Sequence, residues 1–373
     1  MHRREFIKYS CAGLVGLGAG AFSYSLLQMG AENAMRQSCT LQNVQGLTED
    51  ESKILYLTSL APSGHNTQPW TIKVIGPKRW RIGSDETRWL PAVDPDNREM
   101  MLSIGTFIEN LSVASGIYGY EAEVDVIGMD NFSSEIAEVR LVKGRETNVS
   151  EQAIKERRTI RKNLLKSTIR KEDINYLAGN NKNAVFYYPL NSKEGAYLSE
   201  ASLLANKNQV YREAAQTELA EWIRWTDREA SEYGNGLTPE SMEMRGPVRW
   251  YAKHFLRKKD VLGKTFREET LKLVKEQVQT CAGWLVVKSD SSTAADLINA
   301  GRVLEFAWLR AHEKLIAFHP MTQILEEAPW RTEVAGELSH SESCIQFVIR
   351  IGYIKEYLPP VSLRMPLSRI IVT

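Results

Sequence analysis

Hydrophobic positions along this chain follow two periodicities, alternation with polar residues and recurrence every three to four residues, which predict strands and helices respectively. Early in the chain they predict the helices Ser52–Leu60 and Glu99–Tyr118 and the strands Thr71–Ile75, Arg79–Gly83, Glu121–Ile127 and Glu135–Val142. Later they predict a mostly helical stretch, Asp173–Arg257, then a buried strand, Trp284–Lys288, a helix, Ala294–Leu315, and a last strand, Cys344–Gly352. We therefore expect an α+β protein, and we call residues 47–145 its first half and residues 151–373 its second half.

The two long helices contain the same short pattern. Gly105-x-x-x-Glu109 in the first half is matched by Gly301-x-x-x-Glu305 in the second. Each pair follows a strand-and-turn segment, and glycine lets another helix approach closely. The repeat is short, so by itself it only suggests that one half echoes the other.

Composition sets the broad class of the protein. Its 373 residues are 43% hydrophobic and 25% charged, as in ordinary globular proteins. A net charge of +1 creates no overall field that would recruit nucleic acid or an anionic membrane. The six histidines and four cysteines have no spacing typical of a metal site, so no metal is implied.

The first residues resemble an export signal. Arg3-Arg4-Glu5-Phe6-Ile7-Lys8 precedes a glycine-rich apolar run, Cys11–Leu27, and the paired arginines resemble the twin-arginine consensus. We expect residues 1–38 to be a signal and linker that direct the protein to the periplasm. A membrane span is the alternative, although the run is short for one. The cleavage point stays open, and so does retention of the segment as an anchor.

A polar corner joins the first predicted helix to the first strand. Ala61–Trp70 contains two prolines, a glycine and several small polar side chains. Pro69 favours an extended residue before it, and Gly64 permits unusual backbone angles. Such a turn either presents donors and acceptors to a ligand or is simply a capped corner. The candidate ligand-binding residues are Pro62, Ser63, Gly64, Asn66 and Gln68.

The order A-P-S-x-x-N-x-Q-P-W in this corner resembles the signature of the FMN-dependent nitroreductase superfamily. Its H-N-T-Q-P-W spelling is most similar to the exported, two-half Acg-like branch. The resemblance implies a mainly antiparallel sheet surrounded by helices and FMN as the cofactor. Family members are usually dimers that pack through long helices with FMN between subunits. Two fused, diverged halves would imitate that dimer as a monomer, and a homodimer stays open.

The start of the second half is rich in arginine. Guanidinium groups bind phosphate through paired donors, but basic runs are more often solvated helix faces. The resemblance favours phosphate binding over a solvated helix face. Arg157, Arg158, Thr159 and Arg161 match the family's R-R-S-x-R segment, with Thr replacing Ser, and in the family this segment holds the FMN phosphate. The usual order of the two motifs is reversed here. Only one arginine segment is present, which implies one flavin site.

Two later segments complete the expected site. His319-Pro320-Met321-Thr322-Gln323 resembles the segment beside the flavin's pyrimidine ring and N5, so Pro320, Met321 and Thr322 are cofactor-binding candidates. His319 is either a proton donor or a structural histidine. Arg364, in Pro360-x-x-x-Arg364-x-Pro366, is the candidate second phosphate contact.

Three functions follow from the resemblance. The first is an FMN oxidoreductase that takes electrons from NAD(P)H or another donor and reduces a nitroaromatic, a quinone or an unknown small molecule. The second is an FMN-sequestering protein, with the loop Gly234–Gly246 as a lid or merely a connection. The third is a structural or interaction role after loss of flavin binding. Flavin chemistry needs no catalytic side chain, and none is assigned.

Overall fold

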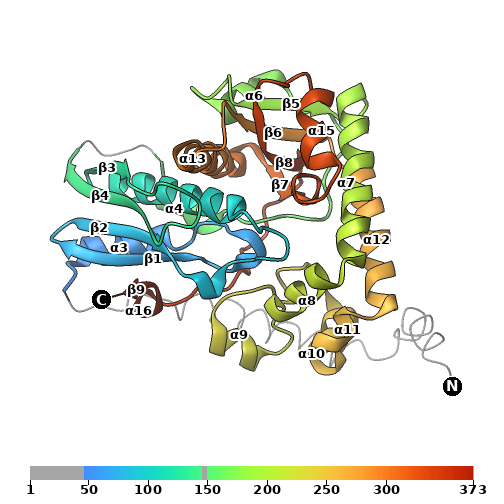
Figure 1. The fold of residues 1–373 in the computed structure, drawn as a ribbon, viewed down its shortest axis with the longest axis horizontal. Coiled ribbons are helices and arrows are strands. Elements are labelled where there is room, and N and C mark those ends of the chain that lie inside the picture. The colour runs from blue at the N-terminus through green and yellow to red at the C-terminus, as the bar shows by residue number, and fades with distance from the viewer. Residues whose placement is uncertain (1–45, 145–148, 373) are drawn as a thin grey trace.

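The computed structural model describes residues 46–144 and 149–372 and has an α+β fold with two sheets (Figure 1). The first sheet has the strand order β3-β4-β2-β1-β9. Its strands are β1 (Trp70–Gly76), β2 (Arg79–Ser84), β3 (Tyr120–Val126), β4 (Glu135–Lys143) and β9 (Ile371–Val372). All neighbours are antiparallel except β1 and β9, which pair in parallel through Ile72 and Ile371. The C-terminal end of the chain thus completes the first sheet.

The second sheet has the order β5-β6-β8-β7 and is antiparallel throughout. Its strands are β5 (Val185–Pro189), β6 (Gly283–Ser289), β7 (Ile316–Pro320) and β8 (Cys344–Tyr353). The expectation of one mainly antiparallel sheet is therefore corrected to two separate sheets. β5 also lies inside a stretch that we expected to be helical. Its Phe-Tyr-Tyr run gains its strand partners only when it meets β6, which is far away in sequence.

Helices surround the two sheets (Figure 1). They are α3 (Glu49–Thr58), α4 (Arg98–Ile117), α5 (Glu151–Glu156), α6 (Lys171–Ala178), α7 (Lys193–Tyr211), α8 (Glu213–Trp222), α9 (Asp227–Tyr233), α10 (Gly246–Phe255), α11 (Lys258–Val261), α12 (Lys264–Gln279), α13 (Ala294–Ala311), α14 (Gln323–Glu326), α15 (Trp330–Glu337) and α16 (Leu367–Ile370). The start of α3 shows how local sequence sets an element. Thr48 and Glu51 form a reciprocal capping box around the first turn.

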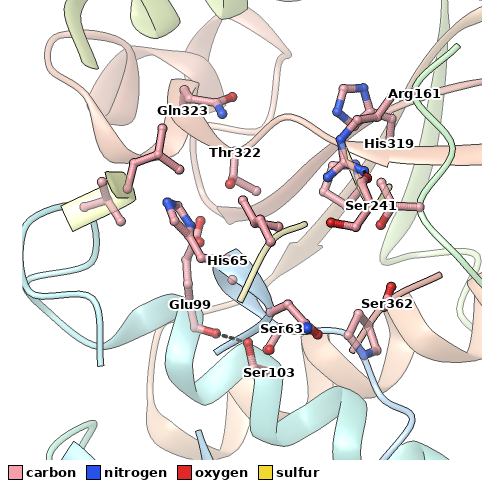
Figure 2. A pocket seen from close by; sticks show the side chains of 18 of the residues that line it. Ser63, His65, Glu99, Ser103, Arg161, Ser241, His319, Thr322, Gln323 and Ser362 are labelled. Carbon is pink, nitrogen blue, oxygen red and sulfur yellow. Dashed lines mark hydrogen bonds between the residues drawn. The ribbon is translucent and has the colours of Figure 1, made fainter. Parts of the chain in front are cut away.

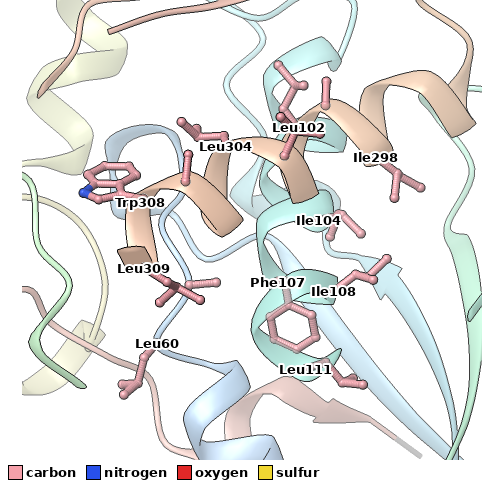
Figure 3. Packing of buried hydrophobic residues seen from close by; sticks show 14 of the residues in the cluster. Leu60, Leu102, Ile104, Phe107, Ile108, Leu111, Ile298, Leu304, Trp308 and Leu309 are labelled. Carbon is pink, nitrogen blue, oxygen red and sulfur yellow. The ribbon is translucent and has the colours of Figure 1, made fainter. Parts of the chain in front are cut away.

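The two long helices α4 and α13 cross in the middle of the largest core cluster (Figure 3). At the crossing, a Cβ added to Gly105 would lie 2.2 Å from the carbonyl oxygen of Ile298, and one added to Gly301 would lie 2.1 Å from that of Leu102. The contacts are reciprocal, because each glycine meets the residue three positions before the other. Leu304 and Phe107 extend the buried surface on either side.

Among the described residues, α4 is the one helix long and apolar enough to cross a membrane, and it is mostly buried inside the protein. Its apolar composition is explained by its place between the sheet and α13. The predicted export signal, residues 1–38, lies outside the described residues.

Candidate functional site

A pocket of about 350 Å³ opens where the two halves meet (Figure 2). Its volume falls at the lower end of the range usual for small-molecule sites. The polar corner and α4 contribute from the first half. The segment after α5, the helices α7, α8 and α13, and the residues after β7 contribute from the second. Segments far apart in sequence therefore converge on one site.

Most of the predicted site residues line this pocket. They are Pro62, Ser63, Gly64, Asn66, Arg157, Arg158, Thr159, Arg161, Pro320, Thr322 and Arg364. Two predicted residues do not line it. The Met321 side chain belongs to the second core cluster, and Gln68 is fully buried in the corner. Met321 follows a β-strand whose alternation turns it toward the core.

The corner is a structural joint as well as a pocket wall. Asn66 Nδ2 donates to the carbonyls of Gly236, at 3.1 Å, and Leu363, at 3.2 Å. Gln68 Nε2 donates to the carbonyl of Gly234 at 3.0 Å, while its Oε1 accepts from the Met365 amide at 3.0 Å. The two amides therefore hold the 234–236 segment and the C-terminal segment against the corner.

The corner backbone also departs from expectation. Pro69 was expected to keep Gln68 extended, yet Gln68 has φ 55°, and His65 and Asn66 have φ 47° and 55°. Left-handed backbone is uncommon for residues other than glycine and is held in place by surrounding contacts. The Gln68 amide proton binds Ser63 Oγ at 2.9 Å, and its carbonyl accepts from Arg88. These tertiary contacts override the local preference.

Arg157 is bound inside the protein. Its Nη2 donates to the Leu60 carbonyl at 2.6 Å, and its guanidinium lies over the Trp308 ring. Its Nε is 3.0 Å from Glu305 Oε1, an ion pair without good hydrogen-bond alignment. Burial raises the pKa of Glu305 to about 7, while the charge of Arg157 opposes that rise. Arg157 thus links the corner to α13 beneath the pocket.

Arg158 and Arg161 gather around one carboxylate from the 234–246 loop. Glu243 Oε1 accepts from Arg158 Nη2 and from the Arg161 amide, both at 3.2 Å. Arg161 Nη1 donates to the Ser241 carbonyl at 2.7 Å. Glu243 is buried and has φ 59°, an unusual backbone angle for a side chain of this kind. The loop therefore closes over the arginine segment and supplies its counter-ion.

Another arginine, which the sequence reasoning missed, lies behind this cluster. Arg350 on β8 is 1% exposed, and its Nη2 donates to the Arg161 carbonyl. Its Nε and Nη1 have no hydrogen-bond partner among the described residues. Burial lowers the pKa of Arg350 to about 10. An arginine in an otherwise apolar strand, F-V-I-R-I, was the signal that could have drawn attention to it.

The charges at this end of the pocket favour an anion. Four guanidinium groups lie in the cluster, those of Arg157, Arg158, Arg161 and Arg350. The carboxylates paired with them in the described residues are Glu243 and Glu305. A buried excess of positive charge is costly unless a further anion compensates it. A phosphate group therefore fits this end of the pocket.

The opposite end holds two half-buried carboxyl groups, those of Glu326 and of Glu99, which the sequence reasoning missed and which Figure 2 labels in part, at Glu99. Glu99 on α4 and Glu326 on α14 hydrogen-bond to each other, and Thr322 Oγ1 donates to Glu326 at 2.7 Å. Burial and the neighbouring Glu326 raise the pKa of Glu99 to about 8, whereas Arg98 opposes the rise. Burial also raises the pKa of Glu326. Two such carboxyls retain a shared proton at neutral pH.

Two histidines line the pocket, and both are neutral. Burial lowers the pKa of His65 to about 4. Burial, together with Arg350 and Arg161, lowers the pKa of His319 well below its usual value. His319 Nδ1 and the buried Oδ1 of Asn206 have no hydrogen-bond partner among the described residues. These two atoms are therefore available to form hydrogen bonds with a ligand in the pocket.

Comparisons with known proteins found distant similarities. No protein-family model matches the chain. It is 25% identical over 343 residues to "Putative NAD(P)H nitroreductase MT3217" of Mycobacterium tuberculosis strain CDC 1551, covering 85% of this chain and 90% of that protein. The same identity and coverage hold for "Putative NAD(P)H nitroreductase Rv3131" of Mycobacterium tuberculosis strain H37Rv.

Two solved structures are also similar. A nitroreductase-like family protein from Bacillus cereus shares 11% identity with a TM-score of 0.33, covering 61% of this chain and 96% of that one. The FMN-dependent nitroreductase NfnB from Mycobacterium smegmatis, in complex with NADPH, shares 15% identity with a TM-score of 0.37, covering 59% and 95%.

Proposed function

We propose that this protein is an FMN-binding oxidoreductase of the nitroreductase type. The observation that carries the proposal is the convergence of the corner, the arginine segment and residues 319–323 on one pocket. Each of these segments carries part of the sequence resemblance, and they come from both halves of the chain. The distant similarity to proteins described as NAD(P)H nitroreductases, along most of the chain, supports the same function.

The chain offers a phosphate end and a ring end. Arg161 and Thr159, backed by Arg158 and Arg350, would hold the phosphate, because they supply the excess of donors and positive charge. When bound, FMN supplies hydride and electron transfer at its ring. Ser63, Thr322 and the neutral His319 would place polar contacts beside that ring.

The carboxyl pair supplies a proton to this site. Glu99 and Glu326 hold a proton between them at neutral pH, inside the pocket. Reduction of a nitro group or a quinone consumes protons as well as electrons, so a protonated carboxyl pair inside the pocket suits either substrate class. NAD(P)H is the proposed electron donor, on the strength of the relatives' descriptions.

The two halves support a fused, dimer-like arrangement. Gly105 and Gly301 make reciprocal contacts, and each is followed four residues later by a glutamate paired with an arginine: Glu109 with Arg302 and Glu305 with Arg157. The reciprocal glycine contacts are what a pseudo-twofold axis between α4 and α13 would produce, whereas the two ion pairs are not equivalent, because Arg302 lies on α13 and Arg157 follows α5. We also propose that the protein is exported, which fractionation of cells expressing the full chain would test.

Titration with FMN tests the proposed function. Purified full-length protein should quench FMN fluorescence on binding, and Arg161→Gln should weaken binding by about tenfold or more, because a charge-assisted contact to phosphate is lost. Arg331→Gln, in an exposed pair with Asp96 outside the pocket, is the matched control and should bind like the wild type. Equal affinities for all three proteins, or no FMN binding at all, would overturn the proposal.

A second candidate function, sequestration of FMN, is favoured by one observation. The 234–246 loop contacts the corner through Gly234 and Gly236, and the arginine segment through Ser241 and Glu243. Bound flavin would therefore lie under a closed loop. Anaerobic NADPH distinguishes the two functions, because a reductase loses its flavin absorbance quickly and a storage protein keeps it.

A further inference from the structure

Helix α10 presents its apolar side chains outward. Val248, Trp250 and Phe255 are 62%, 48% and 56% exposed, whereas Ala252 is 1% exposed and packs inward. The side chain of Lys253 also points inward, and its Nζ binds Glu240 at 2.8 Å. A surface helix normally turns its apolar side to the core and its charges to water. Here the arrangement is reversed.

The outward side chains form one continuous apolar surface. Trp250 lies edge-on to Phe255, with ring centroids 5.6 Å apart, and Tyr251 stacks on Phe255 at 5.2 Å. His254 stacks on Trp250 and binds the Trp250 carbonyl through Nδ1. α10 belongs to the group of short helices, α8 to α11, at the edge of the molecule away from the two sheets (Figure 1). The surface is therefore accessible to a large partner.

Basic side chains flank this surface at both ends of the helix. Arg245 precedes it, and Arg257, Lys258 and Lys259 follow it, all of them exposed. The nearby carboxylates are already paired. Asp227 and Glu240 bind Lys253, Glu221 binds Lys258, and Asp260 caps the start of α11 through the Arg257 amide. The local charge is positive although the chain as a whole is nearly neutral.

We propose that this outward face of α10, residues 245–259, docks on the surface of an anionic lipid bilayer. Exposed tryptophan and tyrosine suit the boundary between acyl chains and headgroups, and the flanking arginines and lysines suit anionic headgroups. A second copy of this chain fits less well. Two α10 helices packed antiparallel would bring Arg245 of one copy beside Arg257–Lys259 of the other, and like charges repel.

Co-sedimentation of the full chain with lipid vesicles tests the proposal. The wild type should bind vesicles that contain phosphatidylglycerol more tightly than vesicles of phosphatidylcholine alone, and high salt should weaken the binding. The double variant Trp250→Ser with Phe255→Ser should lose about tenfold or more in partitioning, because it removes the apolar contact. The triple variant Arg257→Glu, Lys258→Glu and Lys259→Glu should lose as much at low salt.

Phe132→Ser is the matched control, because Phe132 is also 56% exposed but lies between β3 and β4. It should bind vesicles like the wild type. Every variant keeps residues 1–45, so a difference between variants reports on α10 alone. Equal partitioning of the double variant and the wild type would overturn the proposal, and so would absence of binding. A dimer in light scattering that the double variant converts to a monomer would assign the face to a second copy instead.

Discussion

Gly105 and Gly301 touch backbone to backbone, so that a Cβ added to either glycine would lie 2.9 Å from the Cα atom of the other. The contact lies where α4 and α13 cross, and both helices contribute to the largest core cluster. Glu305, one turn after Gly301, pairs with Arg157 beneath the pocket. Small displacements at the crossing therefore reach the candidate site.

Adding a methyl group at this crossing should destabilise the protein. Gly105→Ala places a Cβ 2.2 Å from a backbone carbonyl oxygen that cannot move independently of α13. We expect the free energy of unfolding to fall by about 1–3 kcal/mol or more, measured by urea denaturation. Gly336→Ala in α15 is the control, because the nearest atom there is 3.8 Å away. That control should be neutral or slightly stabilising, and equal destabilisation by both changes would contradict the prediction.

Gln68→Ala should destabilise the corner without changing the lining of the pocket, because Gln68 does not line it. It removes three buried hydrogen bonds, to the carbonyls of Gly234 and Leu363 and from the Met365 amide, and leaves the Gly234 carbonyl and the Met365 amide without this partner. We expect a loss of about 1–3 kcal/mol in thermal or urea unfolding. The exposed Gln152→Ala on α5 should change stability little. If Gln68→Ala instead weakened FMN binding with unchanged stability, Gln68 would be a ligand contact after all.

Glu99 should make stability depend on pH. Its folded-state pKa, about 8, lies above the ordinary value of 4.5, so the protonated form is favoured in the folded protein. The contribution of Glu99 to the free energy of unfolding is therefore fully present below about pH 4.5 and is lost as pH rises through 8, because the unfolded protein releases this proton first. Each unit between the two pKa values corresponds to about 1.4 kcal/mol. Glu99→Gln, which keeps the neutral shape, should flatten the pH dependence of unfolding between those limits.

The control for that measurement is Glu268→Gln, since Glu268 is exposed on α12. It should leave the pH dependence unchanged. A wild-type unfolding curve that is already flat over this range would show that Glu99 and Glu326 do not share a proton in the folded protein.

Glu243→Gln should tighten FMN binding. The Glu243 carboxylate lies against Arg158 and the Arg161 amide, where a phosphate would compete with it or be repelled by it. Removing its negative charge should lower the Kd for FMN by about threefold to tenfold at low salt, measured by fluorescence quenching. Glu240→Gln, in the same loop but paired with Lys253, should not change the Kd. Weaker FMN binding by Glu243→Gln would mean that the loop's closure, not its charge, governs affinity.

Local pattern predicted much of this protein. Helix α4 and strands β1 to β4, β6 and β8 appear within a few residues of their predicted bounds, because the apolar pattern and length of each segment favour its conformation locally. The corner motif and the arginine segment were chosen on residue order, and the structure brings them to one pocket. The paired Gly105 and Gly301 patterns also proved to face each other, which the sequence could only suggest.

What the sequence by itself determined was the position of the long helices and of most strands, the α+β class and the chemical types at the site. Only the tertiary structure decided how those side chains are used. It turned Gln68 and Asn66 into ties to distant backbone, buried Arg157 against Glu305, and brought Glu99 beside Glu326 from opposite halves. The reason is physical: periodicity and turn chemistry act over a few residues, whereas burial, ion pairing and pKa depend on contacts that exist only once remote segments pack together.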